Sequence, residues 1–279
     1  MSTAAPPVAL TIAGSDSGGG AGVQADLKTF AALGTYGTSA LTALTAQSTR
    51  GVIGVHPVPA SFVVEQVEAV LGDLDVRAVK TGMLGTREVV EAVAGLAAAG
   101  RLPHLVVDPV MVATSGDRLL EQPAEQAYVT LLLPHAAVLT PNLLEAQALL
   151  GGTIGTLAEQ REAARALGAL GARLVVVKGG HAVADSGGDA VDVVWDGSDV
   201  RELRSPWVDT ANAHGTGCTF AAAIAAGLAH GRTPAEAVGG AKAYVTGALQ
   251  AAAAWRLGGG SGPLDHLWAV TRSGVGTTA

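Results

Sequence analysis

The sequence predicts an α/β fold with a mainly parallel central sheet covered by helices on both faces. Short, continuously apolar runs alternate with segments that repeat their apolar residues at helical spacing. Several of the runs are apolar throughout, which is typical of strands buried on both sides. Hydrophobic residues make up 49% of the chain and charged residues 15%, so a disordered chain is excluded.

Each element follows from a local pattern. Six apolar runs predict strands at residues 8–13, 39–47, 76–80, 104–108, 136–140 and 174–178. Helical spacing, together with Ser, Thr or Gly at the ends, predicts helices at residues 23–33, 61–71, 86–99, 142–150, 156–170, 217–230 and 234–255. Residues 190–195 and 200–203 flank Asp196-Gly197 and predict an antiparallel hairpin. In such a sheet, ligands bind at the carboxyl ends of the strands.

Length and charge narrow the class of protein. We expect one domain over residues 1–279, with flexible ends at residues 1–7 and 271–279. The net charge of −7 disfavours a general nucleic-acid binder, which needs clustered Lys and Arg. No apolar run reaches the ~18 residues of a membrane span, and no basic residue precedes the first one as in a signal peptide. A single cysteine, Cys218, excludes an intrachain disulfide, so a cytoplasmic protein is expected.

A glycine-rich loop over residues 14–22 follows the first predicted strand. Residues 20–25 match the G-x-G-x-x-A dinucleotide pattern. No acidic residue lies between Asp26 and Glu65 to bind a ribose, which disfavours a dinucleotide site. A tight turn, or backbone N–H groups lining a small-molecule pocket, remain as interpretations. There is no Walker A loop and no G-x-S-x-G nucleophile motif.

The stretch from His214 to Cys218, H-G-T-G-C, precedes a long Ala-rich helix and is the most informative motif. Free N–H groups and the positive end of the helix dipole there predict an anion hole, made by Gly215, Thr216 and Gly217, suited to phosphoryl transfer. Cys218 falls in the first turn, where its pKa should drop below the usual ~8.5. We favour a thiolate base over the alternative of a small buried cysteine.

Five further polar residues lie at or just after the ends of predicted strands. Asn142 and Glu145, three apart, could hold a hydrated Mg²⁺, or form an ordinary helix cap. Asp108 could act at the site or cap a turn, and Lys178 could bind a phosphate or extend to solvent. Gln47 can donate and accept at once, which suits the edge of a heterocycle, although a Gln satisfying a turn is also possible.

Seven blocks in order resemble one family. They are residues 9–28, 40–49, 79–84, 107–115, 140–145, 176–181 and 214–219. Together they are similar to the hydroxymethylpyrimidine/phosphomethylpyrimidine kinases of thiamine biosynthesis, in the ribokinase-like superfamily. The likeness runs from about residue 8 to residue 270. It implies a three-layer α/β/α sandwich, a homodimer, ATP as phosphate donor and Mg²⁺ as cofactor.

The resemblance also implies a reaction and roles for individual residues. The reaction phosphorylates 4-amino-5-hydroxymethyl-2-methylpyrimidine and then converts the monophosphate to the diphosphate. Most ribokinase-like relatives carry Asp as the base where this sequence has Cys218, and the thiamine branch carries Cys. The remaining implied roles are pyrimidine binding by Gln47, Gly14, Met83 and Val110, metal and phosphate organisation by Asp108 and Glu145, and contacts with the ATP phosphates from Lys178, Asn142 and Thr216.

Two departures and two rival functions remain. The family often has Thr before the His of H-G-T-G-C, whereas this chain has Ala213, and residues 185–189 form a short glycine-rich loop on the expected nucleotide side. A pyridoxal or pyridoxine kinase shares the phosphate site and differs in the ring pocket, where Gln47 and Met83 favour the pyrimidine. A non-catalytic binding protein on the same fold is the other alternative, since a fold alone does not establish activity.

Overall fold

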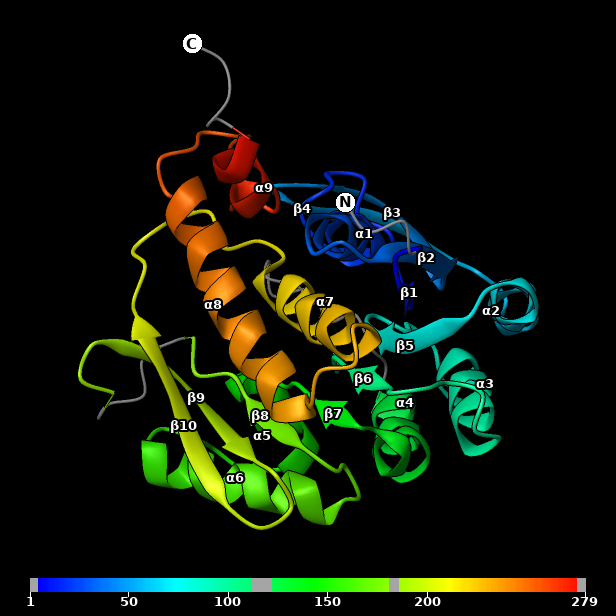
Figure 1. Ribbon diagram of the computed structural model, residues 1–279. Coiled ribbons are helices and arrows are strands. Elements are labelled where there is room, and N and C mark those ends of the chain that lie inside the picture. The colour runs from blue at the N-terminus through cyan, green and yellow to red at the C-terminus, as the bar shows by residue number, and fades with distance from the viewer. Residues whose placement is uncertain (1–4, 112–121, 181–185, 275–279) are drawn as a thin grey trace.

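A computed structural model describes residues 5–111, 122–180 and 186–274, arranged around an eight-stranded sheet (Figure 1). The strand order is β10-β9-β8-β7-β6-β5-β1-β2, and the neighbours from β8 to β2 pair in parallel. Only β9 is antiparallel to both of its neighbours. The strands are β1 (Val8–Ala13), β2 (Tyr36–Leu41), β5 (Val76–Thr81), β6 (Val106–Val107), β7 (Val138–Leu139), β8 (Val175–Val177), β9 (Asp189–Trp195) and β10 (Val200–Pro206).

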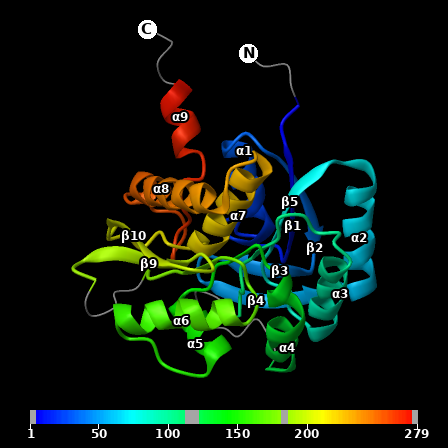
Figure 2. The same cartoon turned by 60° about the horizontal axis from the view of Figure 1, so that its bottom comes forward.

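Helices cover both faces of this sheet, and Figure 2 shows the sheet between the two groups. One face carries α1 (Gly22–Ala32), α7 (Thr216–Ala229), α8 (Pro234–Ala252) and α9 (Trp268–Gly274). The other carries α2 (Ala60–Asp73), α3 (Arg87–Ala98), α4 (Gln122–Ala127), α5 (Leu143–Leu150) and α6 (Leu157–Ala169). The predicted three-layer α/β/α sandwich is therefore confirmed.

Successive residues of one strand belong to two separate hydrophobic cores, one on each face of the sheet. On β5, Ala78 packs against the α7–α8 side and Val79 against the α2–α3 side. Val106 and Val107 divide in the same way on β6. Because strand side chains alternate between faces, a strand covered on both sides is apolar at most positions. This is why the runs read as continuously apolar in the sequence.

Helix α7 lies at the centre of its layer and is buried along most of its length. Every residue from Thr219 to Ala229 is buried. The small Ala and Gly residues of α7 let α8 approach α7 closely. A Cβ added at Gly227 would lie 2.9 Å from the Cβ of Ala237 on α8. The start of α7, which carries the predicted anion hole, is held in place by this packing.

One predicted strand is two strands in the structure. The run over residues 39–47 breaks at Thr42, whose N–H donates to the carbonyl of Ala13 (3.0 Å) and whose hydroxyl donates to the carbonyl of Met83 (2.6 Å). Before the break, β2 belongs to the main sheet. After it, β3 (Ala43–Ser48) pairs antiparallel with β4 (Gly51–Pro57), a strand that the sequence analysis missed. These two strands form a separate two-stranded sheet.

Smaller differences concern element lengths and ends. The strands predicted at residues 104–108 and 136–140 contain only two residues each, in β6 and β7. The helix α4, a π-helical turn (Tyr128–Leu132) and a 3₁₀ turn (Leu133–His135) were not predicted. Residues 271–274, expected to be flexible, belong to α9, whereas residues 1–4 and 275–279 lie outside the described ranges.

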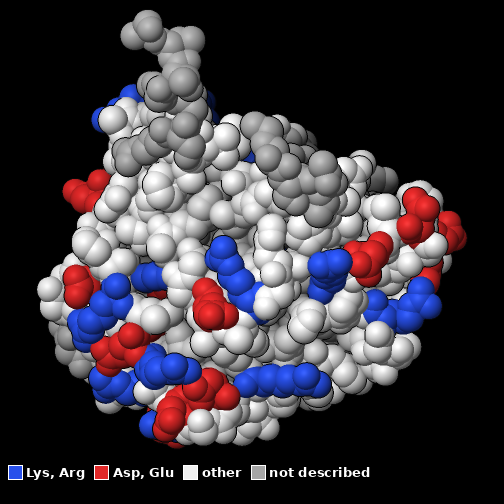
Figure 3. All heavy atoms as spheres, in the orientation of Figure 1, with Lys and Arg blue, Asp and Glu red and all other residues white. Residues whose placement is uncertain are grey.

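The surface charge and the helices relate to two classes that the sequence disfavours, nucleic-acid binders and membrane proteins. On the face shown in Figure 3, Lys and Arg mix with Asp and Glu over its lower part, so neither sign gathers into one patch there. Among the described helices, none combines the length and the apolar character that crossing a membrane requires.

Candidate active site

The carboxyl ends of neighbouring parallel strands bring the predicted residues Asp108 and Lys178 together with Thr140, which was not predicted as a site residue. Asp108 follows β6, Thr140 follows β7 and Lys178 follows β8. The Lys178 ammonium lies 3.0 Å from Asp108 Oδ1, and the Thr140 hydroxyl donates to the same oxygen at 3.2 Å. Burial alone would lower the pKa of Lys178, but the carboxylates of Asp108 and Glu145 outweigh it and raise that pKa. Lys178 therefore stays charged at the edge of the sheet.

The second oxygen of Asp108 is buried and has no hydrogen-bond partner among the described residues. It faces the start of α7, because a Cβ built on Gly217 would lie 3.8 Å from Asp108 Oδ2. The same position is 3.0 Å from Lys178 Nζ. Any side chain at residue 217 would occupy this space. A glycine there leaves room between a carboxylate oxygen and an ammonium group.

The first turn of α7 supplies backbone donors to that space. Gly215, the N-cap, has φ = 86°, and a Cβ there would lie 1.8 Å from the carbonyl oxygen of Gly20, so only glycine fits. Thr216 directs both its N–H (3.2 Å) and its hydroxyl (2.6 Å) at the carbonyl of Ala213. The N–H groups of Gly217 and Cys218 have no acceptor among the described residues. They lie at the positive end of the helix, where free N–H groups can bind an anion.

The expectation of a lowered thiol pKa at Cys218 is wrong for the ligand-free protein. Burial raises the pKa of Cys218 to about 11, and the carboxylates of Asp26 and Asp108 act in the same direction. The positive charge of Lys80 offsets only part of this rise. A position in the first turn of a helix lowers a thiol pKa when the sulfur is solvated, but here the loss of solvation dominates.

A buried ion pair beneath Cys218 was not predicted. Lys80 Nζ lies 2.8 Å and 3.0 Å from the two carboxylate oxygens of Asp26, and both side chains are fully buried. Thr11 donates a further hydrogen bond to Asp26 at 2.6 Å. The pair joins α1 to β5 and places a fixed positive charge near the thiol.

Asn142 and Glu145 form the helix cap that was the alternative to a metal site. Asn142 Oδ1 accepts the N–H of Glu145, and Glu145 Oε2 accepts the N–H of Asn142, both at 2.8 Å. Glu145 Oε1 has no partner among the described residues. Burial raises the pKa of Glu145 to about 7, with Lys178 lowering it and Asp108 raising it further.

Of the residues predicted to surround the substrate, Gly14, Met83 and Val110 follow β1, β5 and β6, and Gln47 lies on β3. A Cβ built on Gly14 would lie 2.3 Å from Met83 Cε, so the methionine closes over the glycine. Gln47, on β3, is held through its backbone, whose N–H and carbonyl each bond Ser17 Oγ at 2.8 Å. Val110 is half-buried and donates its N–H to the carbonyl of Asp108 at 2.8 Å.

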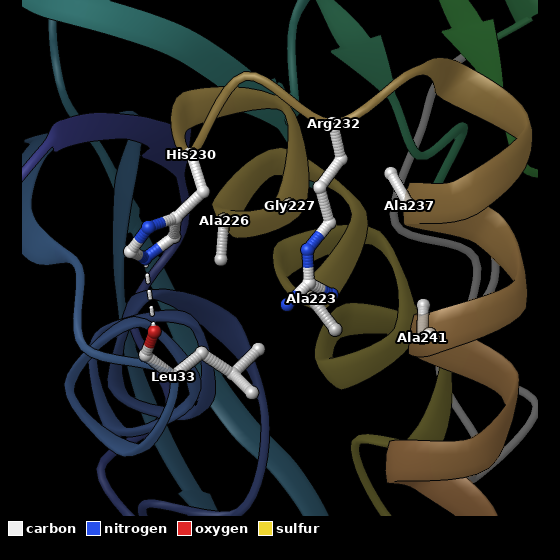
Figure 4. Close-up of a pocket in the computed structure, with 9 residues that line it drawn as sticks. Leu33, Ala223, Ala226, Gly227, His230, Arg232, Ala237 and Ala241 are labelled. Carbon is white, nitrogen blue, oxygen red and sulfur yellow. Dashed lines mark hydrogen bonds between the residues drawn. The ribbon is translucent and has the colours of Figure 1, made fainter.

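Two predicted segments fall partly outside the described residues. The block over residues 107–115 is described only as far as residue 111, and the glycine-rich loop over residues 185–189 only from residue 186. A pocket at the other end of α7 is distinct from the site (Figure 4). Ala and Gly residues line most of it, together with His230 and Arg232, and none of its lining residues carries a carboxylate.

The residues fit a sparse Mg²⁺ site rather than a dense one. The described residues contain no cluster of three or more His, Cys, Asp or Glu that could hold a metal by themselves. However, Mg²⁺ usually takes one or two carboxylates together with water and substrate phosphates. The unpartnered Oδ2 of Asp108 and Oε1 of Glu145 are oxygen donors of that kind.

Comparison with known proteins gives consistent matches over nearly the whole chain. The family model described as phosphomethylpyrimidine kinase matches residues 16–265. A hydroxymethylpyrimidine/phosphomethylpyrimidine kinase from Streptomyces coelicolor is 52% identical over 265 residues, which cover 95% of this chain and 96% of that protein. A Geobacter sulfurreducens protein named thiamine biosynthesis bifunctional protein ThiED is 50% identical over 261 residues, 94% of this chain but only 52% of that protein.

Among solved structures, a pyridoxal kinase from Staphylococcus aureus in complex with AMP-PCP and pyridoxal superposes with a TM-score of 0.84. It is 39% identical, and the superposition covers 94% of each chain. The likeness confirms the predicted fold class independently of the sequence comparison.

Proposed function

The chain belongs to the phosphomethylpyrimidine kinase family, and from this premise we propose that it phosphorylates 4-amino-5-hydroxymethyl-2-methylpyrimidine with ATP. A second transfer converts the monophosphate to the diphosphate, which serves thiamine biosynthesis. One observation carries the proposal: the free N–H groups of Gly217 and Cys218 lie at the start of α7, beside the Lys178–Asp108 pair. Phosphoryl transfer needs donors and a cation aimed at the moving group.

In this mechanism the ends of the strands hold the transferred phosphoryl group. The N–H groups of Gly217 and Cys218 donate to its equatorial oxygens, and Lys178 offsets its charge. Asn142 and Thr216 lie along the remaining ATP phosphates. The Thr216 hydroxyl proton already binds the carbonyl of Ala213, so this hydroxyl turns before it donates to a phosphate. Most of the rate then comes from positioning and electrostatics.

Cys218 receives the proton of the substrate hydroxyl. In the ligand-free protein the group is a thiol, because burial raises its pKa to about 11. Only the small thiolate fraction can accept a proton, and the nearby Lys80 charge stabilises that fraction. In a loose transition state the substrate hydroxyl loses its proton late in the transfer. The reaction can therefore proceed although only a small fraction of Cys218 is thiolate.

Mg²⁺ would be held by Asp108 Oδ2 and Glu145 Oε1. When bound, it would neutralise charge on the ATP phosphates. Asp108 Oδ1 keeps Lys178 in place meanwhile, since the two atoms are 3.0 Å apart. Glu145 stays anchored through Oε2 to the N–H of Asn142. The two acids therefore offer one oxygen each while their other oxygen fixes their orientation.

The pyrimidine ring is proposed to lie against Gly14, Met83, Gln47 and Val110. Gln47 offers an amide, which can accept from the ring's amino group and donate to the adjacent ring nitrogen. Met83 supplies a flexible apolar surface, and its side chain already covers Gly14. The hydroxymethyl group would then point from the end of β1 towards Cys218.

Pyridoxal phosphorylation is the second candidate. The observation that favours it is the 39% identical pyridoxal kinase with pyridoxal bound. The 52% identical relative carries the pyrimidine kinase name, which favours the pyrimidine.

The deciding experiment compares kcat/KM for the two compounds by ADP release, with Mg-ATP saturating. We expect at least tenfold preference for the pyrimidine, and phosphorus NMR of the products should show a diphosphate. Higher kcat/KM on pyridoxal, with no diphosphate formed, would favour the second candidate. Absence of ADP release with either compound would contradict the kinase assignment itself.

We further propose a cytoplasmic homodimer. Two apolar side chains of β4 support a second copy as partner: Ile53 and Val55 are 91% and 49% exposed. Light scattering of the purified chain tests the dimer, and a monomer at assay concentration would contradict it.

A further inference from the structure

A buried carboxylate outside the reaction mechanism organises the glycine-rich loop. Asp16 is 1% exposed. Its Oδ1 accepts the N–H of Gly18 at 2.8 Å, and its Oδ2 accepts those of Gly20 (3.0 Å) and Ala21 (2.8 Å). The same Oδ2 lies 2.8 Å from His214 Nε2. Burial alone would raise the pKa of Asp16, but the hydrogen bonds from His214, Ala21 and Gly18 lower it to about 2.

The carboxylate determines which nitrogen of His214 carries hydrogen. A carboxylate only accepts hydrogen bonds, so His214 Nε2 must be an N–H group that donates to Asp16. This holds for both the neutral and the charged ring, since the neutral ring then has its hydrogen on Nε2. The next polar group along is the side-chain amide of Gln47, with Nε2 placed 3.5 Å from His214 Nε2.

The amide of Gln47 has one orientation that satisfies its neighbours. With Nε2 towards His214, two donors face each other. On its other side, Gln47 Oε1 lies 3.3 Å from Thr45 Oγ1, whose single proton binds the carbonyl of Ser15 at 2.9 Å. Turning the amide by 180° lets Oε1 face the His214 N–H, whose single hydrogen it shares with Asp16 Oδ2, and lets Nε2 donate to the Thr45 oxygen. Amide orientation is assigned from hydrogen bonds, and these favour the turned form.

Asp16 also ties the two halves of the site together through the backbone. Ser17, next in the loop, clamps the N–H and carbonyl of Gln47 at 2.8 Å each. Gly20, held by Asp16, contacts the N-cap Gly215 so closely that a Cβ there would lie 1.8 Å from the Gly20 oxygen. One buried carboxylate thus fixes the substrate strand β3 and the start of α7 relative to each other.

We infer that Asp16 and His214 are positioning residues that orient the Gln47 amide for its substrate. With the His214 N–H shared between the Asp16 carboxylate and the Gln47 amide oxygen, one Oε1 lone pair and one Nε2 hydrogen of Gln47 remain free. Those two groups match the edge of a 4-aminopyrimidine, an amino donor beside a ring-nitrogen acceptor. The inference rests on the proposed function, in which Gln47 contacts that edge.

A double-mutant cycle between residues 214 and 47 tests the inference. The variants are His214→Leu, Gln47→Leu and the double, with KM for the pyrimidine and for ATP measured by ADP release. Losing one oriented hydrogen bond of about 1 kcal/mol corresponds to about fivefold in KM. We expect His214→Leu to raise the pyrimidine KM by that factor with ATP KM within twofold. The double variant should be no worse than Gln47→Leu.

Matched variants separate positioning from general damage. His214→Gln keeps a donor near the Nε2 position and should recover the pyrimidine KM to within about threefold. His214→Asn stays polar but is too short to reach Asp16, so it should behave like His214→Leu and replaces it if that variant does not fold. His230→Leu is the control, because His230 Nε2 bonds the carbonyl of Leu33 at 3.0 Å, outside the site (Figure 4). Its pyrimidine KM should not change.

The outcomes separate the positioning role of Asp16 and His214 from the proposed contact of Gln47 with the substrate. An unchanged pyrimidine KM in Gln47→Leu would contradict the proposed substrate contact. If Gln47→Leu raises KM while the His214 variants do not, the positioning inference fails and the proposed function stands. The inference also fails if the effects of His214→Leu and Gln47→Leu simply multiply in the double variant, because independent residues give multiplicative effects.

Discussion

The raised pKa of Cys218 makes a quantitative prediction for the pH dependence of the reaction. Burial raises this pKa from 9.0 to about 11. At pH 7 the thiolate fraction is then about 1 in 10⁴, against about 1 in 100 for an unperturbed thiol. If the thiolate accepts the substrate proton, kcat/KM for the pyrimidine should rise about tenfold for each pH unit. Glu145, with a pKa of about 7, also titrates near neutrality, so the slope is measured from pH 8 to 9.5.

The assay is ADP release at saturating Mg-ATP, with circular dichroism confirming the folded state at each pH. Cys218→Ala is the control. It should keep the pyrimidine Kd within about threefold, lose about 10²- to 10⁴-fold in turnover, and lose the tenfold slope. A flat profile from pH 8 to 9.5 in the unmodified enzyme, or near-normal kcat in Cys218→Ala, would refute the base assignment. The anion hole would survive that result, because backbone N–H groups form it.

Three further predictions concern stability and geometry. Lys80→Met leaves Asp26 buried without its partner, so urea unfolding should show a loss of about 3–5 kcal/mol, and adding Asp26→Leu should restore most of it. Gly215→Ala should lower kcat more than tenfold because its Cβ meets backbone at 1.8 Å, whereas the control Gly231→Ala, also at positive φ but in open space, should lose only stability. Asp16 has its pKa lowered from 3.8 to about 2, so its stabilisation is present above pH 4 and is lost as pH falls towards 2. Thermal melts of Asp16→Asn should therefore fall less steeply than wild type over that window, and equal slopes would contradict the assignment.

The parts of the site that lie at strand ends could be predicted from the sequence. An apolar run followed at once by Asp108 or Lys178 places both side chains at the same edge of a parallel sheet, and the structure brings them to 3.0 Å. The H-G-T-G-C motif likewise indicated free N–H groups ahead of a helix, and those of Gly217 and Cys218 have no acceptor among the described residues. These predictions depend on local pattern and on strand direction alone.

The missed features depend on distance along the chain and on burial. The Lys80–Asp26 pair joins residues 54 apart, and the Asp16–His214 contact joins residues 198 apart. Neither shows in a local pattern, although both acids stand near glycines in the loop or the helix that follows it. The prediction of a lowered thiol pKa at Cys218 was wrong for a related reason. The sequence shows that Cys218 lies in the first turn of a helix, but it does not show that the sulfur is buried.

The break at Thr42 was missed for a different reason. The run over residues 39–47 contains no glycine or proline, so nothing in its composition marks an end. What ends β2 is the contact of Thr42 with the carbonyls of Ala13 and Met83, which only the folded chain supplies. The following strand then had to pair elsewhere, and it pairs with β4.

In the proposed function, the separate β3–β4 sheet supplies one substrate contact, apart from the groups that bind phosphate. Gln47 lies on it, whereas Asp108, Lys178 and the start of α7 belong to the main framework. Since the hairpin pairs with no strand of the large sheet, residues 43–57 could be exchanged between related vitamin kinases without breaking hydrogen bonds between strands of the large sheet. In the proposed function, such an exchange would change the Gln47 contact with the substrate, while Asp108, Lys178 and the start of α7 keep their own sequence.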